Sequence, residues 1–171
     1  AVLMAILISP MIVPLIITAA GMFFFYSKIG LTHSYLGLIL AHTALGTPFV
    51  VITVTATLTG FDTNLIRASQ SLGADTMRTF FKIIMPLILP GVISGALFAF
   101  ITSFDEVVVV MFIGSVEQIT IPKQMWAGLR QETSPVILCM ATCLVALSIA
   151  LLTTVEMLRR RSERLRGIKQ R

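Results

Sequence analysis

Long apolar stretches alternate with short polar segments along the whole chain. Four of these stretches contain no Asp, Glu, Lys or Arg: residues 1–27, 29–61, 83–103 and 133–155. A helix needs roughly 20 apolar residues to cross the hydrocarbon core of a bilayer. The pattern therefore predicts four membrane-spanning helices, near residues 3–25, 36–58, 87–110 and 135–157.

Composition agrees with a membrane protein. The 171 residues are 56% hydrophobic and 12% charged, with a mean hydropathy of +0.94. A soluble domain carries about 25% charged residues. We therefore expect an all-α fold, a polytopic membrane helix bundle with the lipid bilayer as its surroundings.

The positive charges are distributed very unevenly. Of the 13 Lys and Arg residues, seven fall in residues 159–171 and three more, Arg67, Arg78 and Lys82, lie between the second and third predicted spans. Basic residues flank the cytoplasmic ends of spans. The distribution therefore predicts a cytoplasmic C-terminus with a basic tail at 159–171, and it does not favour nucleic acid as the partner behind the net charge of +5.

Prolines and small residues interrupt the apolar spans. Pro10, Pro14 and Pro48 indicate kinked helices, which line a cavity in some membrane proteins and only pack in others. Gly91 and Gly95 form a small-xxx-small row that lets another helix approach closely, within this chain or in another subunit.

Few polar side chains fall inside the spans. His42 is interpreted as a hydrogen-bonding residue between helices, with a proton relay as the alternative. Cys139 and Cys143 are spaced for one face of a helix and are interpreted as small packing residues, because a metal site needs further ligands nearby. The sequence predicts no metal and no cofactor.

Asp105 and Glu106 stand near the outer end of the third predicted span. Acidic residues at membrane depth usually face a cavity or a partner. One interpretation is an acidic patch on the path of a cation, and the other is a structural hydrogen-bonding pair. On a continuous helix the two side chains would point about 100° apart, so we do not expect both to face one cavity.

A polar hairpin is predicted between the second and third spans. Asp62 is a good N-cap for a first short helix, Gly73 suits the left-handed residue at its end, and Asp75 or Thr76 can cap a second helix. An apolar stripe predicts that the second helix packs on the bundle: Met77, Phe80, Phe81 and Ile84. The hairpin is either an interfacial connector or the docking element for another protein. A short helix is also expected in the external loop 114–134.

The hairpin resembles the cytoplasmic signature of the inner-membrane subunits of type I ABC importers. That signature is Glu-Ala-Ala, three residues, Gly, nine residues, Ile, any residue, Leu-Pro. Here the pattern is Arg67-Ala68-Ser69, three residues, Gly73, nine residues and Ile83-Ile84-Met85-Pro86. Arg67 replaces the Glu, Ser69 the second Ala and Met85 the Leu. The resemblance implies a set of residues that couple to an ATPase: Arg67, Ala68, Ser69, Gly73, Ala74, Ile83 and Pro86.

The resemblance covers essentially the whole chain, and residues 103–109 are most similar to spermidine/putrescine-type permeases. It implies a transmembrane domain at 1–158 with coupling helices at about 62–85. Because such permeases have six spans, the chain is expected to be the C-terminal part of one. It also implies a bacterial inner-membrane protein whose substrate is a polyamine or related cationic amine, with Asp105 and Glu106 on the substrate pathway.

The same resemblance implies a set of partners. They are cytoplasmic ATP-binding subunits, a second permease subunit in a homo- or heterodimer, and a periplasmic solute-binding protein. The chain itself is not expected to be an enzyme, because no glycine precedes a lysine and the core of a phosphate-binding P-loop is therefore absent. The alternative function is a secondary transporter or channel fragment driven by an ion gradient.

Overall fold

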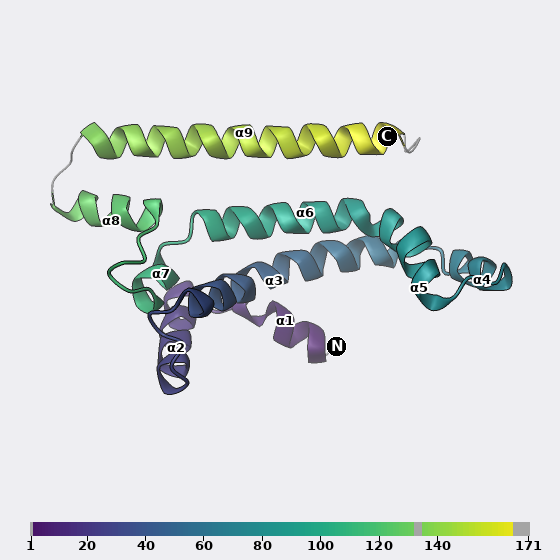
Figure 1. Ribbon diagram of the computed structural model, residues 1–171, viewed down its shortest axis with the longest axis horizontal. Helices are drawn as coiled ribbons and strands as arrows, with labels where there is room; N and C mark the ends of the chain where they lie inside the picture. The colour runs from purple at the N-terminus through teal and green to yellow at the C-terminus, as the bar shows by residue number, and fades with distance from the viewer. Residues whose placement is uncertain (1, 132–134, 166–171) are drawn as a thin grey trace.

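The structure is a computed structural model that describes residues 2–131 and 135–165, and within these ranges every regular element is a helix. Helices α3, α6 and α9 run along the long axis of the molecule (Figure 1). The predicted all-α membrane bundle is confirmed. The elements are α1 Val2–Ile12, α2 Leu15–Lys28, α3 Tyr35–Thr59, α4 Asn64–Ser71, α5 Thr76–Thr79, the π-helical turn η1 Phe80–Ile84, α6 Met85–Phe104, α7 Val108–Ile113, α8 Ile121–Gln131 and α9 Pro135–Leu165.

The first predicted span is wrong as a single helix. It consists of α1 and α2, whose axes differ in direction by 109°. The break falls at Val13 and Pro14, because a residue before proline is disfavoured in helical conformation. Pro14 itself is extended, with φ −52° and ψ 132°. Of the other predicted spans, the second and fourth correspond to α3 and α9, which are long and apolar enough to cross a membrane, as is the helical segment Thr76–Phe104.

Helices α3 and α6 form the closest pair in the bundle. A Cβ atom added to Gly95 would lie 2.7 Å from the Cα of Val50, and one added to Gly46 would lie 2.9 Å from the Cβ of Ala99. The contact therefore depends on residues without bulk, as small-residue rows in membrane helices allow. The small-residue row predicted from the sequence packs within this chain.

The buried core lies where α2, α3 and α7 meet. Its fully buried members include Ala19 of α2, Ala41 of α3 and Ile113 of α7. Tyr26 of α2 is also buried here, at 8% exposure. The loop after α2 is tied to α7 because the His33 N–H donates to the Ile113 carbonyl at 2.8 Å.

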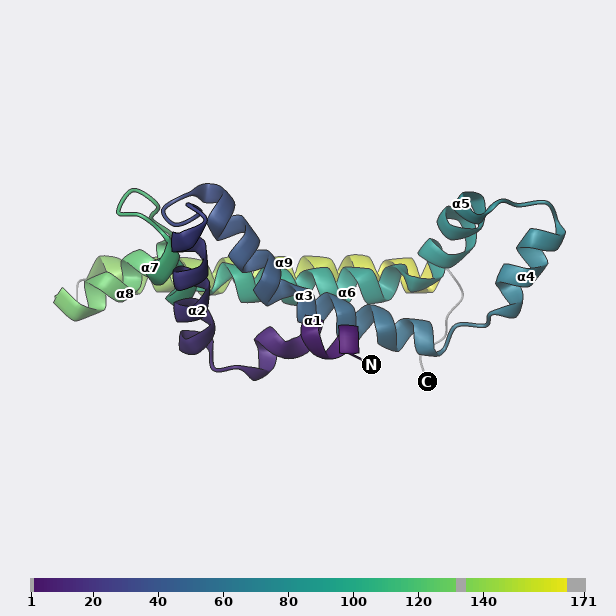
Figure 2. The same ribbon diagram turned by 90° about the horizontal axis from the view of Figure 1, so that it is seen from below.

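The two ends of the bundle carry different elements. The α4–α5 hairpin and the C-terminal end of α9 lie at one end, and α7 and α8 lie at the other (Figures 1 and 2). Helix α8 is the short helix expected in loop 114–134. The part of the predicted basic tail that the structure describes, residues 159–165, continues helix α9 at the hairpin end. The rest of the tail lies outside the described residues.

Candidate functional site

The α4–α5 hairpin has the helix–glycine–helix geometry that the sequence predicts. Asp62 Oδ1 accepts the N–H of Asn64 at 2.9 Å at the start of α4. Gly73 has φ +81°, in the left-handed region that glycine adopts without strain. Asp75 caps α5, since its carboxylate accepts the Arg78 N–H at 2.7 Å.

The hairpin is closed by bonds across the turn. The Gly73 N–H donates to the Gln70 carbonyl at 2.9 Å, and the Ala74 N–H donates to the Ser69 carbonyl at 3.1 Å. The side chains of Ser69 and Thr79 join α4 to α5 through a hydrogen bond of 2.7 Å between their hydroxyls. The turn is therefore held by backbone and side-chain bonds together.

The outer part of the hairpin is exposed. The hairpin projects beyond the adjoining ends of α3 and α6 (Figures 1 and 2). Arg67, Ala68 and Gly73 are exposed, whereas Ile83 and Pro86 are half-buried where the hairpin joins α6. The signature residues thus divide into an exposed group at the tip and a packed group at the base.

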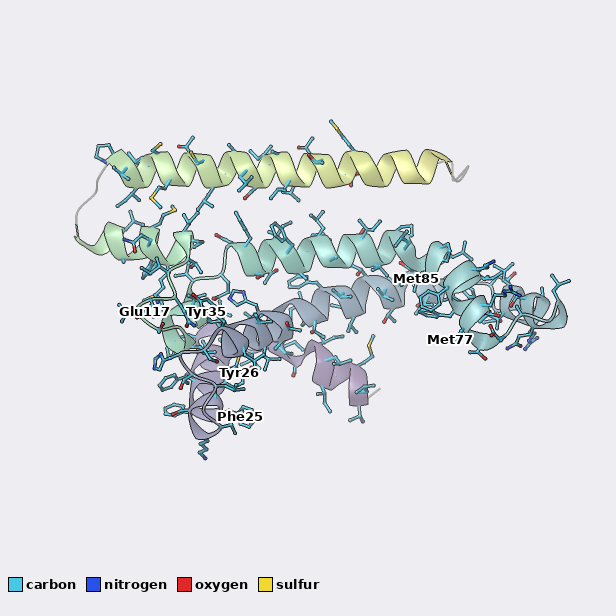
Figure 3. The ribbon with its side chains drawn as sticks, in the orientation of Figure 1. Phe25, Tyr26, Tyr35, Met77, Met85 and Glu117 are labelled. Carbon is cyan, nitrogen blue, oxygen red and sulfur yellow. The ribbon has the colours of Figure 1, made fainter. Side chains whose placement is uncertain are left out.

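The predicted apolar stripe on the second helix is wrong. Met77, which is labelled in Figure 3, is 66% exposed, and Phe81 is 57% exposed, while Thr79 is buried. The spacing assumed an α-helix, but residues 80–84 form a π-helix, in which the Met85 N–H bonds to the Phe80 carbonyl five residues back. The extra residue in the turn changes which side chains share a face.

Glu106 is a structural acid. Its exposure is 6%, and its carboxylate accepts the Val109 N–H at 2.9 and 3.0 Å and the Val110 N–H at 3.2 Å. It therefore caps the start of α7. The third span was predicted to run to residue 110, but α6 ends at Phe104, and Asp105 and Glu106 lie between two helices. They are therefore not neighbours on one continuous helix, and the expectation that they would not face one cavity is wrong, because both line the same cavity.

Asp105 is exposed and lines a cavity of about 700 Å³. The same cavity is lined by the broken segment from Pro10 to Leu15 and by Thr102 of α6. The ends of α1 and α6 thus meet at one cavity, and the carbonyl ends of helices carry partial negative charge. The sequence did not predict this meeting, although Pro14 marked one of the two breaks.

A larger cavity, of about 960 Å³, opens between α3, α6 and the loop before α8. His42 Nδ1 lies 2.8 Å from Ser103 Oγ in its wall, so His42 joins α3 to α6 as the first interpretation expected. Tyr35 and Glu117 line the end of the cavity near α7 (Figure 3). Glu117 could not be predicted as a lining residue from the sequence, because a single acid in a loop carries no pattern.

The described residues contain no group of three or more His, Cys, Asp or Glu side chains that could hold a metal ion. The site therefore consists of a projecting hairpin at one end of the bundle and of two cavities toward the other end. A projecting hairpin and cavities between membrane helices fit the class of transport subunits.

The comparison with family models agrees with that class. Residues 1–164 match the family of binding-protein-dependent transport system inner membrane components. The chain belongs to this family, the inner-membrane permeases of type I ABC importers. The family predicted from the hairpin signature is confirmed.

The chain is similar to permeases named for polyamines. It is 32% identical over 152 residues to the spermidine/putrescine transport system permease protein PotC of Haemophilus influenzae. This alignment covers 89% of the present chain and 59% of the relative. The chain is 28% identical over 145 residues to the putrescine transport system permease protein PotI of Escherichia coli, covering 80% of this chain and 51% of the relative. The chain thus spans just over half the length of these relatives.

A solved structure shares the fold. The chain superposes on a subunit from inward-facing conformations of the MetNI methionine ABC transporter with a TM-score of 0.74. The sequences are 21% identical, and the alignment covers 94% of this chain and 73% of that one. This likeness supports the bundle architecture.

Proposed function

We propose that the chain is part of a permease subunit of an ATP-driven importer, in which a separate cytoplasmic subunit hydrolyses ATP. The observation that carries the proposal is the α4–α5 hairpin, which projects from the bundle and exposes Arg67 and Ala68. The family to which the chain belongs supports it. The hairpin is the docking element for the ATP-binding subunit.

The proposed mechanism is rigid-body coupling. When the ATP-binding subunits close, they move the docked hairpin, and the hairpin moves α6 because Ile83 and Pro86 join the two without an intervening loop. Such coupling requires an element that keeps its shape under load. The membrane helices then alternate between inward-facing and outward-facing arrangements.

The proposed substrate is a polyamine or related cationic amine. Two features support this class: the similarity to PotC and PotI, and the exposed carboxylate of Asp105 at a cavity bordered by helix carboxyl ends. An ammonium group is stabilised by a carboxylate and by the carboxyl ends of helices. Asp105 is the proposed substrate contact, and Glu106 acts through the backbone that it caps.

The proposed setting is the bacterial inner membrane with the hairpin and the C-terminus in the cytoplasm. The basic residues at the hairpin end agree with this orientation. A second permease subunit completes the pathway, and a periplasmic solute-binding protein delivers the amine from the side of α7 and α8.

The test is uptake by the complete transporter reconstituted in liposomes. The liposomes contain ATP or a non-hydrolysable analogue, and radiolabelled putrescine is supplied with the binding protein outside. We expect uptake only with ATP, and no effect of an uncoupler. Uptake that continues without ATP and collapses with the uncoupler would instead support a transporter driven by an ion gradient.

A further inference from the structure

We propose that Ser69 and Thr79 form a hydroxyl clasp that keeps α4 and α5 at a fixed angle, and that both are positioning residues for energy coupling. The inference rests on the proposed function; it adds Thr79 to the coupling step and gives Ser69 a defined contact in it. The two side chains are ten positions apart and belong to different helices. Their hydroxyl oxygens lie 2.7 Å apart.

The clasp also includes a backbone carbonyl of α4. Ser69 Oγ also lies 3.1 Å from the Ile66 carbonyl oxygen, to which it donates. A serine hydroxyl has one proton and two lone pairs. When that proton lies toward the Ile66 carbonyl, the Thr79 hydroxyl donates to Ser69 Oγ, and when it lies toward Thr79, Ser69 is the donor. In the first case the chain of bonds runs from α5 through Ser69 into the backbone of α4.

Burial separates this pair from other hydroxyls at the same end of the molecule. Ser69 is 6% exposed and Thr79 is 3% exposed, although the hairpin around them is open to solvent. Thr59, at the end of α3, is exposed and its hydroxyl bonds only to the Thr55 carbonyl of its own helix. A buried hydrogen bond is shielded from competing water, so it resists opening better than an exposed one.

The position of the clasp suits a mechanical role. Ser69 stands where the family signature has a second alanine, whose methyl group cannot form this bond. Thr79 is the last residue of α5, directly before the π-helical turn that leads into α6. The clasp therefore joins the docking helix to the segment that enters the membrane. Without the clasp, the backbone hydrogen bonds across the Gly73 turn alone resist bending of the hairpin.

The experiment compares two substitutions of Thr79 in the complete transporter. Thr79→Val keeps the shape of the side chain and removes the hydroxyl, whereas Thr79→Ser keeps the hydroxyl and removes the methyl. Thr59→Val is the matched control, since it makes the same chemical change at an exposed hydroxyl. Amines transported per ATP hydrolysed and the amount of ATP-binding subunit retained are measured for each variant.

We expect Thr79→Val to retain the ATP-binding subunit and to lower the transport per ATP by about 3- to 10-fold, the range given by one net hydrogen bond. Thr79→Ser and Thr59→Val should keep the wild-type ratio. Ser69→Ala should match Thr79→Val, and combining them should add little, because either change alone opens the clasp. A Thr79→Val variant with the wild-type ratio, or a larger loss in Thr79→Ser, would overturn the inference. Failure of the proposed function gives a different result from failure of this inference, because the wild-type complex itself would then show no ATP-driven uptake.

Discussion

Replacing Glu106 and Asp105 separately should give two different defects, although the residues are adjacent. The Glu106 carboxylate accepts the N–H groups of Val109 and Val110 at 2.9 to 3.2 Å, in a site that is 6% exposed. Glu106→Ala leaves both donors without this acceptor at the start of α7. Each unpaired buried donor costs about 1–3 kcal/mol, so we expect the two donors together to cost about 2–6 kcal/mol of stability.

This loss is measurable as a change in melting temperature. At roughly 2–4 °C per kcal/mol for a domain of this size, Glu106→Ala should lower the Tm in detergent by roughly 4–24 °C. Glu106→Gln retains one carbonyl acceptor and should lose about 1–2 kcal/mol. Asp105→Asn should keep the wild-type Tm, because that side chain is exposed.

The uptake assay should rank the two residues differently. Asp105→Asn removes the negative charge of the proposed substrate contact. It should reduce putrescine uptake by about 10-fold or more while the protein stays folded. Glu117→Ala is a control for removing an exposed acid and should keep the Tm. If Glu106→Ala has the same Tm as the wild-type protein, the capping role of Glu106 is refuted. If Asp105→Asn imports putrescine normally, Asp105 is not on the pathway.

Three further substitutions test the packing and the hairpin. Gly95→Ala places a methyl group 2.7 Å from a backbone atom of α3 and should cost about 1–3 kcal/mol of stability. In the control Gly21→Ala, the added methyl group meets nothing within 4 Å. Thermal unfolding compares the two variants, and equal Tm values would contradict the close packing of α3 and α6. Gly73→Ala forces a residue with a side chain into the backbone conformation with φ +81°, which should destabilise the turn by about 1–2 kcal/mol. The measurement is retention of the ATP-binding subunit, which should weaken. Unchanged retention would contradict the role of the Gly73 turn in docking. His42→Leu should cost about 1 kcal/mol, and adding Ser103→Ala should cost little more, because the 2.8 Å contact is already lost; additive losses in Tm would contradict it.

Local chemistry explains which parts of the fold could be predicted. Gly73 and Asp75 act on their immediate neighbours, so the turn and the cap of α5 followed from a few residues. The apolar stretches predicted α3 and α9 because a helix in lipid must be long and uncharged. Gly91 and Gly95 predicted a close helix contact, although only the structure shows that its partner is α3.

The remaining features depend on contacts that no local pattern contains. The end of α6 at Phe104 is not visible in an apolar run, because it depends on Glu106 bonding to α7 instead of extending the helix. The π-helix at 80–84 changed the face of the hairpin without an unusual residue to mark it. Ser69 and Thr79 are ordinary hydroxyl residues until the fold buries them together.

Residue-specific cross-linking tests the docking of the hairpin most directly. Cys139 and Cys143 are first replaced by alanine, and a single cysteine is then introduced at Ala68 or at Val116. Both positions are exposed, but Ala68 lies on α4 and Val116 lies in the loop at the opposite end. Each cysteine is labelled with a photoactivatable maleimide in the complete transporter. We predict that the ATP-binding subunit is captured from Ala68 and not from Val116; no capture from Ala68, or capture from Val116, would contradict the coupling role of the hairpin.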